Sequence, residues 1–74
     1  MKIYIVKVMG ENSSAHLNLS KATNTACKII ESKSHTFFKP VLEALVEFVR
    51  EGKLSLLDKS NRIWSIEIET LDVD

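Results

Sequence analysis

The most informative part of this 74-residue sequence is the segment at positions 37–51, which reads FFKPVLEALVEFVRE. On a helical wheel its apolar side chains fall in one sector, and its charged side chains and Pro40 fall in the other. We therefore predict a helix over residues 37–51, with Thr36 as N-cap and Pro40 in the first turn. Gly52 is predicted to end the helix in a left-handed conformation. The apolar sector spans about 200°, whereas a stripe of roughly 100° suffices to cover one sheet face. Something besides a single sheet face should cover this helix.

Two strands are predicted at the start of the chain. Residues 2–9 are rich in β-branched and aromatic side chains, which is typical of a well-covered strand. Residues 10–14 form a turn cluster, and apolar Ala15, Leu17 and Leu19 then alternate with polar residues. The pattern predicts a hairpin with a five-residue loop, in which His16 lies on the polar side of its strand.

A short amphipathic helix is predicted between this hairpin and the segment at 37–51. Ser20 can cap a helix that begins at Lys21. Ala22, Ala26 and Ile30, together with Ile29, share one side of that helix, and polar residues cover the other. We expect its apolar side to lie on the sheet.

The last part of the sequence predicts a second hairpin. Residues 54–57 and 62–71 are its strands, and the four residues at 58–61 are its turn. Trp64, Ile66 and Ile68 alternate with Ser65, Glu67 and Glu69. This alternation predicts that the apolar face of the last strand is buried and that its polar face is exposed to solvent. The order ββααββ predicts an α+β fold, with one antiparallel sheet of about four strands and both helices on one face. We find no repeat or linker, so residues 1–74 are predicted to form a single domain.

The overall charge is balanced, with ten basic and ten acidic residues. Residues 1–40 hold six lysines and two glutamates, a balance of +4, and residues 41–74 hold four basic and eight acidic residues, a balance of −4. A general basic field for nucleic acid is therefore absent. A chain of this size hides only about 62% of its surface on folding, so a partner or a second copy could contribute to its stability.

The cysteine count and the N-terminal segment predict a cytoplasmic chain. Cys27 is alone, so it cannot form a disulfide within the chain. The first apolar run, at positions 3–6, is too short for a signal-peptide core or a membrane span. We expect no membrane association.

No group of residues predicts catalysis or metal binding. His16, Cys27 and His35 are eleven and eight residues apart, whereas zinc ligands come in close pairs. Cys27 flanks the apolar side of its predicted helix and is interpreted as a packing residue. Glu67 and Glu69 are interpreted as a solvated strand face, because a chain this small has little room for a catalytic cleft. We predict no enzyme activity, no cofactor and no metal.

Protein binding is the first functional hypothesis. The last eight positions hold Glu67, Glu69, Asp72 and Asp74 and no basic residue, so they could meet a basic surface, although a soluble sheet edge is the simpler interpretation. Phe38 and Val46, from the wide apolar sector, are the other predicted contact residues. In size and build alone, the chain is similar to small proteins of bacteria, phages and mobile elements, many of which bind and block a larger host complex. Self-association is the other form of this hypothesis.

Nucleic-acid binding is the alternative hypothesis. Lys21 and Lys28 share a helix face at i and i+7, and Lys33 lies a turn beyond. However, all five aromatic residues fall in apolar patterns, which leaves none to stack on bases beside these lysines. The second helix also lacks the polar recognition face of a helix-turn-helix.

Overall fold

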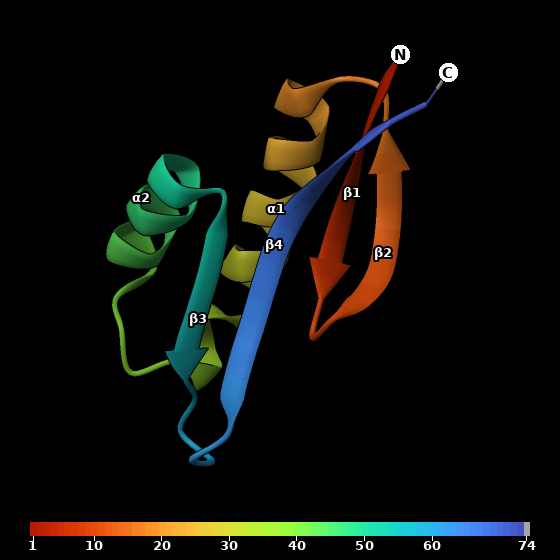
Figure 1. The fold of residues 1–74 in the computed structure, drawn as a ribbon. Coiled ribbons are helices and arrows are strands. Elements are labelled where there is room, and N and C mark those ends of the chain that lie inside the picture. The colour runs from red at the N-terminus through yellow and green to blue at the C-terminus, as the bar shows by residue number, and fades with distance from the viewer. Residues whose placement is uncertain (74) are drawn as a thin grey trace.

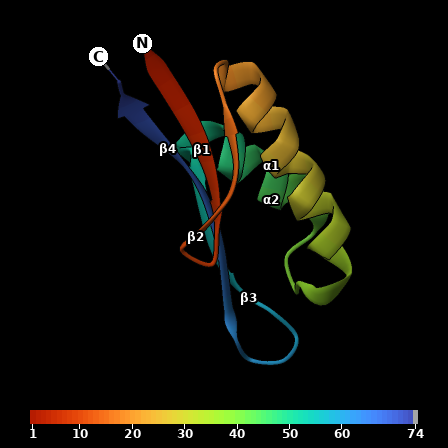
Figure 2. The same ribbon diagram turned by 90° about the vertical axis from the view of Figure 1, so that its right-hand side faces the viewer.

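The computed structural model describes residues 1–73 and shows four strands and two helices in the order ββααββ (Figure 1). The elements are β1 (Lys2–Val8), β2 (Glu11–His16), α1 (Leu19–Lys33), a 3-10 turn (Ser34–Thr36), α2 (Val41–Glu51), β3 (Lys53–Leu57) and β4 (Ile63–Asp72). All strand pairs are antiparallel, and the strand order is β2-β1-β4-β3. Both helices lie on one side of this sheet (Figure 2). The predicted α+β fold is confirmed.

The first hairpin differs from its prediction. Its turn is the two-residue pair Met9–Gly10, both with positive φ, as the tightest hairpin turns require. β2 therefore begins at Glu11, and an irregularity in the pairing leaves Ser13 without a partner residue. His16 pairs with Tyr4, a residue packed against the core, so His16 lies on the inner face and Ala15 is exposed. The predicted faces of this strand were wrong, because a change of one residue in register exchanges the faces.

The first helix begins two residues earlier than predicted. The side chain of Asn18, not Ser20, caps it by accepting a hydrogen bond from the Lys21 backbone N–H at 3.2 Å. The predicted apolar side is correct, because Ala22, Ala26 and Ile30 are fully buried. The two alanines allow α1 to lie close to the sheet.

The second helix is shorter than predicted. It begins at Val41, with Pro40 as the extended N-cap residue at φ −58° and ψ 144°, so neither Thr36 as N-cap nor Pro40 in the first turn is correct. A proline disfavours helical backbone in the residue before it, which explains why the helix does not include Lys39. Gly52 ends the helix in the left-handed conformation at φ 74°, as predicted.

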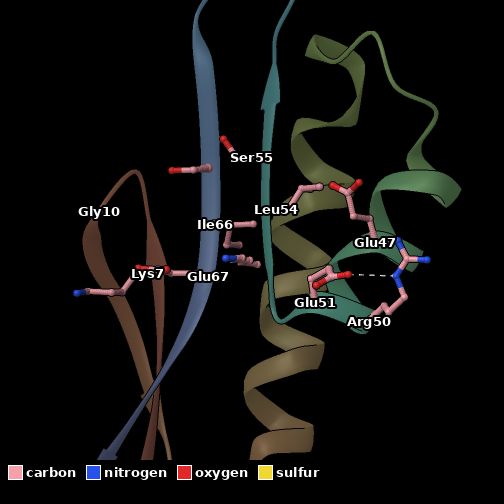
Figure 3. Close-up of a pocket in the computed structure, with 11 residues that line it drawn as sticks. Lys7, Gly10, Glu47, Arg50, Glu51, Leu54, Ser55, Ile66 and Glu67 are labelled. Atoms are coloured by element: carbon pink, nitrogen blue, oxygen red, sulfur yellow. Dashed lines mark ion pairs between the residues drawn. The ribbon is translucent and has the colours of Figure 1, made fainter.

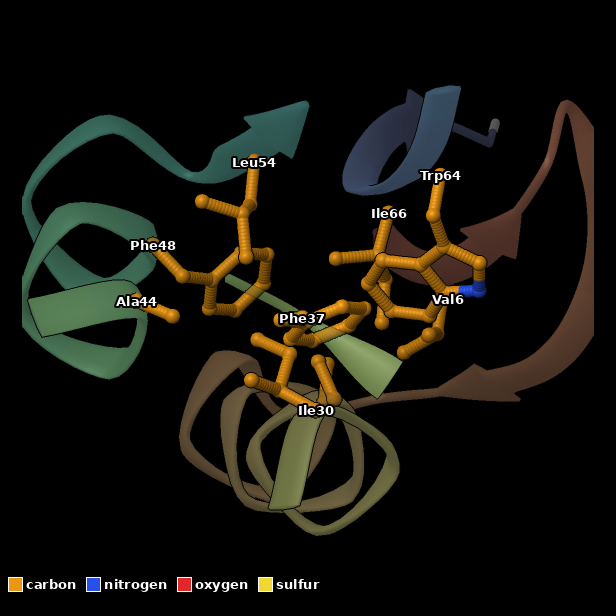
Figure 4. Close-up of a cluster of buried hydrophobic side chains, with 10 residues drawn as sticks. Val6, Ile30, Phe37, Ala44, Phe48, Leu54, Trp64 and Ile66 are labelled. Carbon is orange, nitrogen blue, oxygen red and sulfur yellow. The ribbon is translucent and has the colours of Figure 1, made fainter. Parts of the chain in front are cut away.

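Phe37 is the residue that the predicted helix misplaced. It is extended, forms a β-bridge with Asp58 beyond β3, and is only 3% exposed. Its ring centroid lies 5.1 Å from that of Trp64, in a tilted arrangement favourable for aromatic pairs. Figure 4 shows Phe37 among core side chains from both helices and the sheet. Phe37 thus fills the core from a connecting segment rather than from a helix.

The second hairpin agrees with its prediction. Trp64 and Ile66 are buried, and Glu67 is exposed on the opposite face of β4. In the turn, the Asp58 carboxylate accepts hydrogen bonds from the backbone N–H groups of Ser60 and Arg62 at 2.8 and 3.0 Å. The inner face of the sheet therefore carries the core, and its outer face has no helix on it.

The adjacent pair Phe37 and Phe38 gives a matched test of this fold. Phe37→Ala should lower the free energy of unfolding by about 3–5 kcal/mol, because it empties a core position. Phe38→Ala should change it by no more than about 0.5 kcal/mol, because Phe38 is 65% exposed. Urea denaturation followed by circular dichroism measures both. Equal losses would contradict the placement of these two rings.

Candidate functional site

An apolar row on the outside of α2 is the strongest candidate for a functional surface. The helix is anchored through Ala44 and Phe48, which are 0% and 1% exposed. Figure 4 shows both side chains directed from α2 into the core. The opposite side of α2 faces away from the rest of the described chain, and none of the helices and strands of residues 1–73 lies beyond it (Figure 1). Whatever α2 carries on that side is open to solvent.

We use the name α2 ridge for four exposed large apolar residues: Phe38, in the segment that leads into α2, and Leu42, Val46 and Val49 on this side of the helix. Their exposed fractions are 65%, 72%, 64% and 62%. The three that belong to the helix lie within about 60° of arc, so they form one row. Taking about 60–120 Å² for each full side chain, the ridge presents roughly 160–320 Å² of apolar surface. This approaches the size of the apolar patches that are often functional on small monomers.

The sequence predicted two members of the ridge and missed two. Phe38 and Val46 were predicted as contact residues, and the structure exposes both. Leu42 and Val49 were placed in the apolar sector but not singled out. Once Ala44 and Phe48 are taken as the anchor, the wheel positions of Leu42 and Val49 point away from the core. That spacing was the signal available in the sequence.

The predicted acidic surface on β4 is largely balanced by lysines on neighbouring strands. Lys7 Nζ lies 2.6 Å from a carboxylate oxygen of Glu69, and this hydrogen-bonded carboxylate raises the pKa of Lys7. Glu67 is exposed and directly opposite both Lys7 on β1 and Lys53 on β3. Asp72 is opposite Lys2 near the end of β4, on the same side of the strand as Ile66 and not on the outer face, and Asp74 lies outside the described residues. The outer sheet face is therefore mixed in charge rather than acidic.

A hollow of about 460 Å³ lies beside β3 (Figure 3). Its wall combines the outer sheet face with the end of α2, and it carries three basic and three acidic side chains: Lys7, Arg50, Lys53, Glu47, Glu51 and Glu67. Ser55 and Ser65 also line it, but the described residues around it include no histidine or cysteine that could act as a base or nucleophile. Its chemistry is that of a balanced polar surface.

The two histidines and the cysteine lie on three separate elements. His16 is half-buried on β2, where its Nε2 lies 2.8 Å from Ser14 Oγ. Cys27 is half-buried on α1, and this burial raises the pKa of its thiol, which disfavours the nucleophilic thiolate. His35 is exposed in the 3-10 turn. Within residues 1–73, no three His, Cys, Asp or Glu side chains gather as they would around a metal ion.

The three predicted nucleic-acid lysines are all exposed on α1. Lys21, Lys28 and Lys33 form no ion pair with any of the described residues. Glu31 is exposed on the same helix, and the residues of α1 include no aromatic side chain. The helix therefore offers positive charge without a surface for stacking on bases.

No helix among the described residues has the length and apolar character needed to cross a membrane. Comparisons with known protein families, with curated proteins and with solved structures find no match to this chain.

The Lys7–Glu69 pair predicts a pH-dependent contribution to stability. Because Glu69 raises the pKa of Lys7 above its usual 10.5, the pair stabilises the fold at neutral pH and loses its effect as pH rises through the raised pKa. Glu69→Gln should therefore lower the free energy of unfolding at pH 7, and its difference from wild type should shrink at alkaline pH. Urea denaturation across the alkaline range measures this difference.

Glu67→Gln is the matched control, because Glu67 acts on Lys7 only through a weaker charge interaction. It should change the free energy of unfolding less than Glu69→Gln does. A difference between wild type and Glu69→Gln that stays constant or grows above the pKa of Lys7 would contradict this assignment.

Proposed function

We propose that this chain is a non-catalytic protein-interaction module and that the α2 ridge is its contact surface. The proposal is carried by one observation: Leu42, Val46 and Val49 on α2, and Phe38 just before it, are each more than three-fifths exposed, although the helix is well anchored. Single exposed apolar residues are ordinary, but a contiguous row on one helix is typical of binding surfaces. Positions 42, 46 and 49, at i, i+4 and i+7 of α2, also follow the spacing of anchors in helix-mediated recognition.

Folding alone does not account for the ridge. Among residues 1–73, ten buried apolar residues form the core, and none of the four ridge residues belongs to it. Polar substitution along the ridge should therefore leave the fold intact and remove only what the ridge binds. Regulation of a larger complex by stoichiometric binding in the cytoplasm is one form of the activity that we propose for such a module, and self-association through the same surface is the other. The half-buried free thiol of Cys27 is in keeping with that compartment.

Nucleic-acid binding through α1 is the second candidate. It is favoured by the exposure of Lys21, Lys28 and Lys33 and by the absence of ion pairs to them among the described residues. It is the weaker candidate, because α1 combines these charges with Glu31 and with no aromatic side chain.

Photo-crosslinking separates the two candidates. A benzophenone amino acid at position 46 should give a discrete protein adduct in cells that make the chain, because Val46 is at the centre of the exposed row. The same group at position 28, on the exposed side of α1, is the matched control and should give none. Leu42→Asp should abolish the adduct at position 46 while changing the free energy of unfolding by only about 0.5 kcal/mol.

Absence of any adduct at position 46 would contradict the proposed function. Nucleic-acid adducts at position 28, lost when the three lysines are replaced by glutamine, would establish the alternative instead.

A further inference from the structure

We infer that the α2 ridge binds the α2 ridge of a second copy of this chain, in an antiparallel pair related by a two-fold axis near Val46. This inference rests on the proposed function and names the partner of the same surface. It follows from the shape of the ridge, from the charges beside it and from the area that it offers.

The shape of the ridge fits another helix. Two shallow hollows, of about 330 and 390 Å³, lie on α2, and both are lined by Val46 and Arg50. Val46 thus stands between two grooves, which is the surface that packs against a second helix when the ridges of one enter the grooves of the other. With a two-fold axis at Val46, the two Val46 side chains meet, and Leu42 lies beside Val49 of the second copy.

The charged residues beside the ridge are complementary to the same residues in a second copy of the chain. Glu43 and Arg50 are two helical turns apart on the same flank of the ridge. Glu43 forms no ion pair within the described residues, and Arg50 meets only its neighbour Glu51, at 3.4 Å between two exposed side chains. An antiparallel pair places each Glu43 beside Arg50 of the other copy, because two-fold symmetry brings the same flanks together.

The remaining charges near the ridge do not oppose this arrangement. Lys39 Nζ donates a hydrogen bond to a Glu47 carboxylate oxygen at 3.1 Å within the same chain, and both side chains are about one-third exposed. This pair is already neutral before a second copy arrives. The flank therefore presents Glu43, which has no ion pair with the described residues, and Arg50, whose only ion pair is the 3.4 Å contact with Glu51 between two exposed side chains.

The available area predicts a weak and reversible dimer. The accessible surface is 5064 Å², against roughly 4,600 Å² expected for a monomer of this mass. That excess of roughly 450 Å² belongs to the whole molecule, whose extents are 42 × 21 × 18 Å. The ridge itself presents roughly 160–320 Å², which is less than half of the 800 Å² or so that each partner contributes to a standard interface. The pair should therefore form with increasing concentration and dissociate on dilution.

Sedimentation velocity over a range of concentrations tests the inference with a charge exchange. Wild-type chain should shift from monomer to dimer as concentration rises. The Glu43→Arg substitution alone places an arginine beside Arg50 of the other copy, and Arg50→Glu alone places a glutamate beside Glu43 of the other copy. Because like charges then meet, each substitution should weaken self-association about tenfold or more. Mixing the two variants should restore dimers of mixed composition, because each then meets its opposite charge.

If the chain is a monomer at every concentration, the inference that a second copy is the partner is wrong. The crosslink at position 46 then still tests the proposed function separately. Dimers that persist in Val46→Asp would overturn the ridge as the interface. Dimers lost in Val46→Asp but unaffected by either charge reversal would overturn the antiparallel arrangement. Circular dichroism of each variant establishes that it remains folded.

Discussion

The burial of Phe37 against Trp64 is the contact from which the rest of this structure follows. It places an aromatic ring in the core from the segment that connects the two helices. Since Pro40 then directs the chain into α2, the helix begins only at Val41 and reaches the core through Ala44 and Phe48. The apolar sector of α2 is wider than this attachment requires. The excess is left on the outside, where it forms the α2 ridge.

The two surfaces that the helices leave open differ in chemistry. On the outer face of the sheet, lysines opposite acidic residues neutralise β4, as the contact between Lys7 and Glu69 shows. On α2, apolar side chains lie in a row, and their flanking charges, Glu43 and Arg50, are not paired with each other. A neutralised face is well solvated by itself, whereas an apolar row gains free energy when another surface covers it. This difference is why the proposed contact lies on α2.

Patterns of apolar residues predicted most of the fold, and local signals misplaced its boundaries. The helical wheel identified both helices, and the alternation of apolar and polar residues identified the solvent-exposed face of β4, because periodicity reflects which side is buried. The wheel could not show that Phe37 leaves the helix for the core while Phe38 remains outside, since that depends on Trp64, distant in sequence. The first hairpin was misplaced because Met9 is not a typical turn residue. The wheel likewise gave the width of the apolar sector without showing which part of it the core would cover.

The central claim is that the α2 ridge is open in the free chain and covered when two copies meet. Methyl NMR with a soluble gadolinium chelate measures this directly, because the chelate broadens only the methyl signals that it can approach. At low concentration the Leu42, Val46 and Val49 methyl signals should be strongly broadened, and at high concentration they should be protected, whereas buried Leu54 should be protected throughout. Ridge signals that are protected at the lowest concentration, or broadened equally at the highest, would contradict the account.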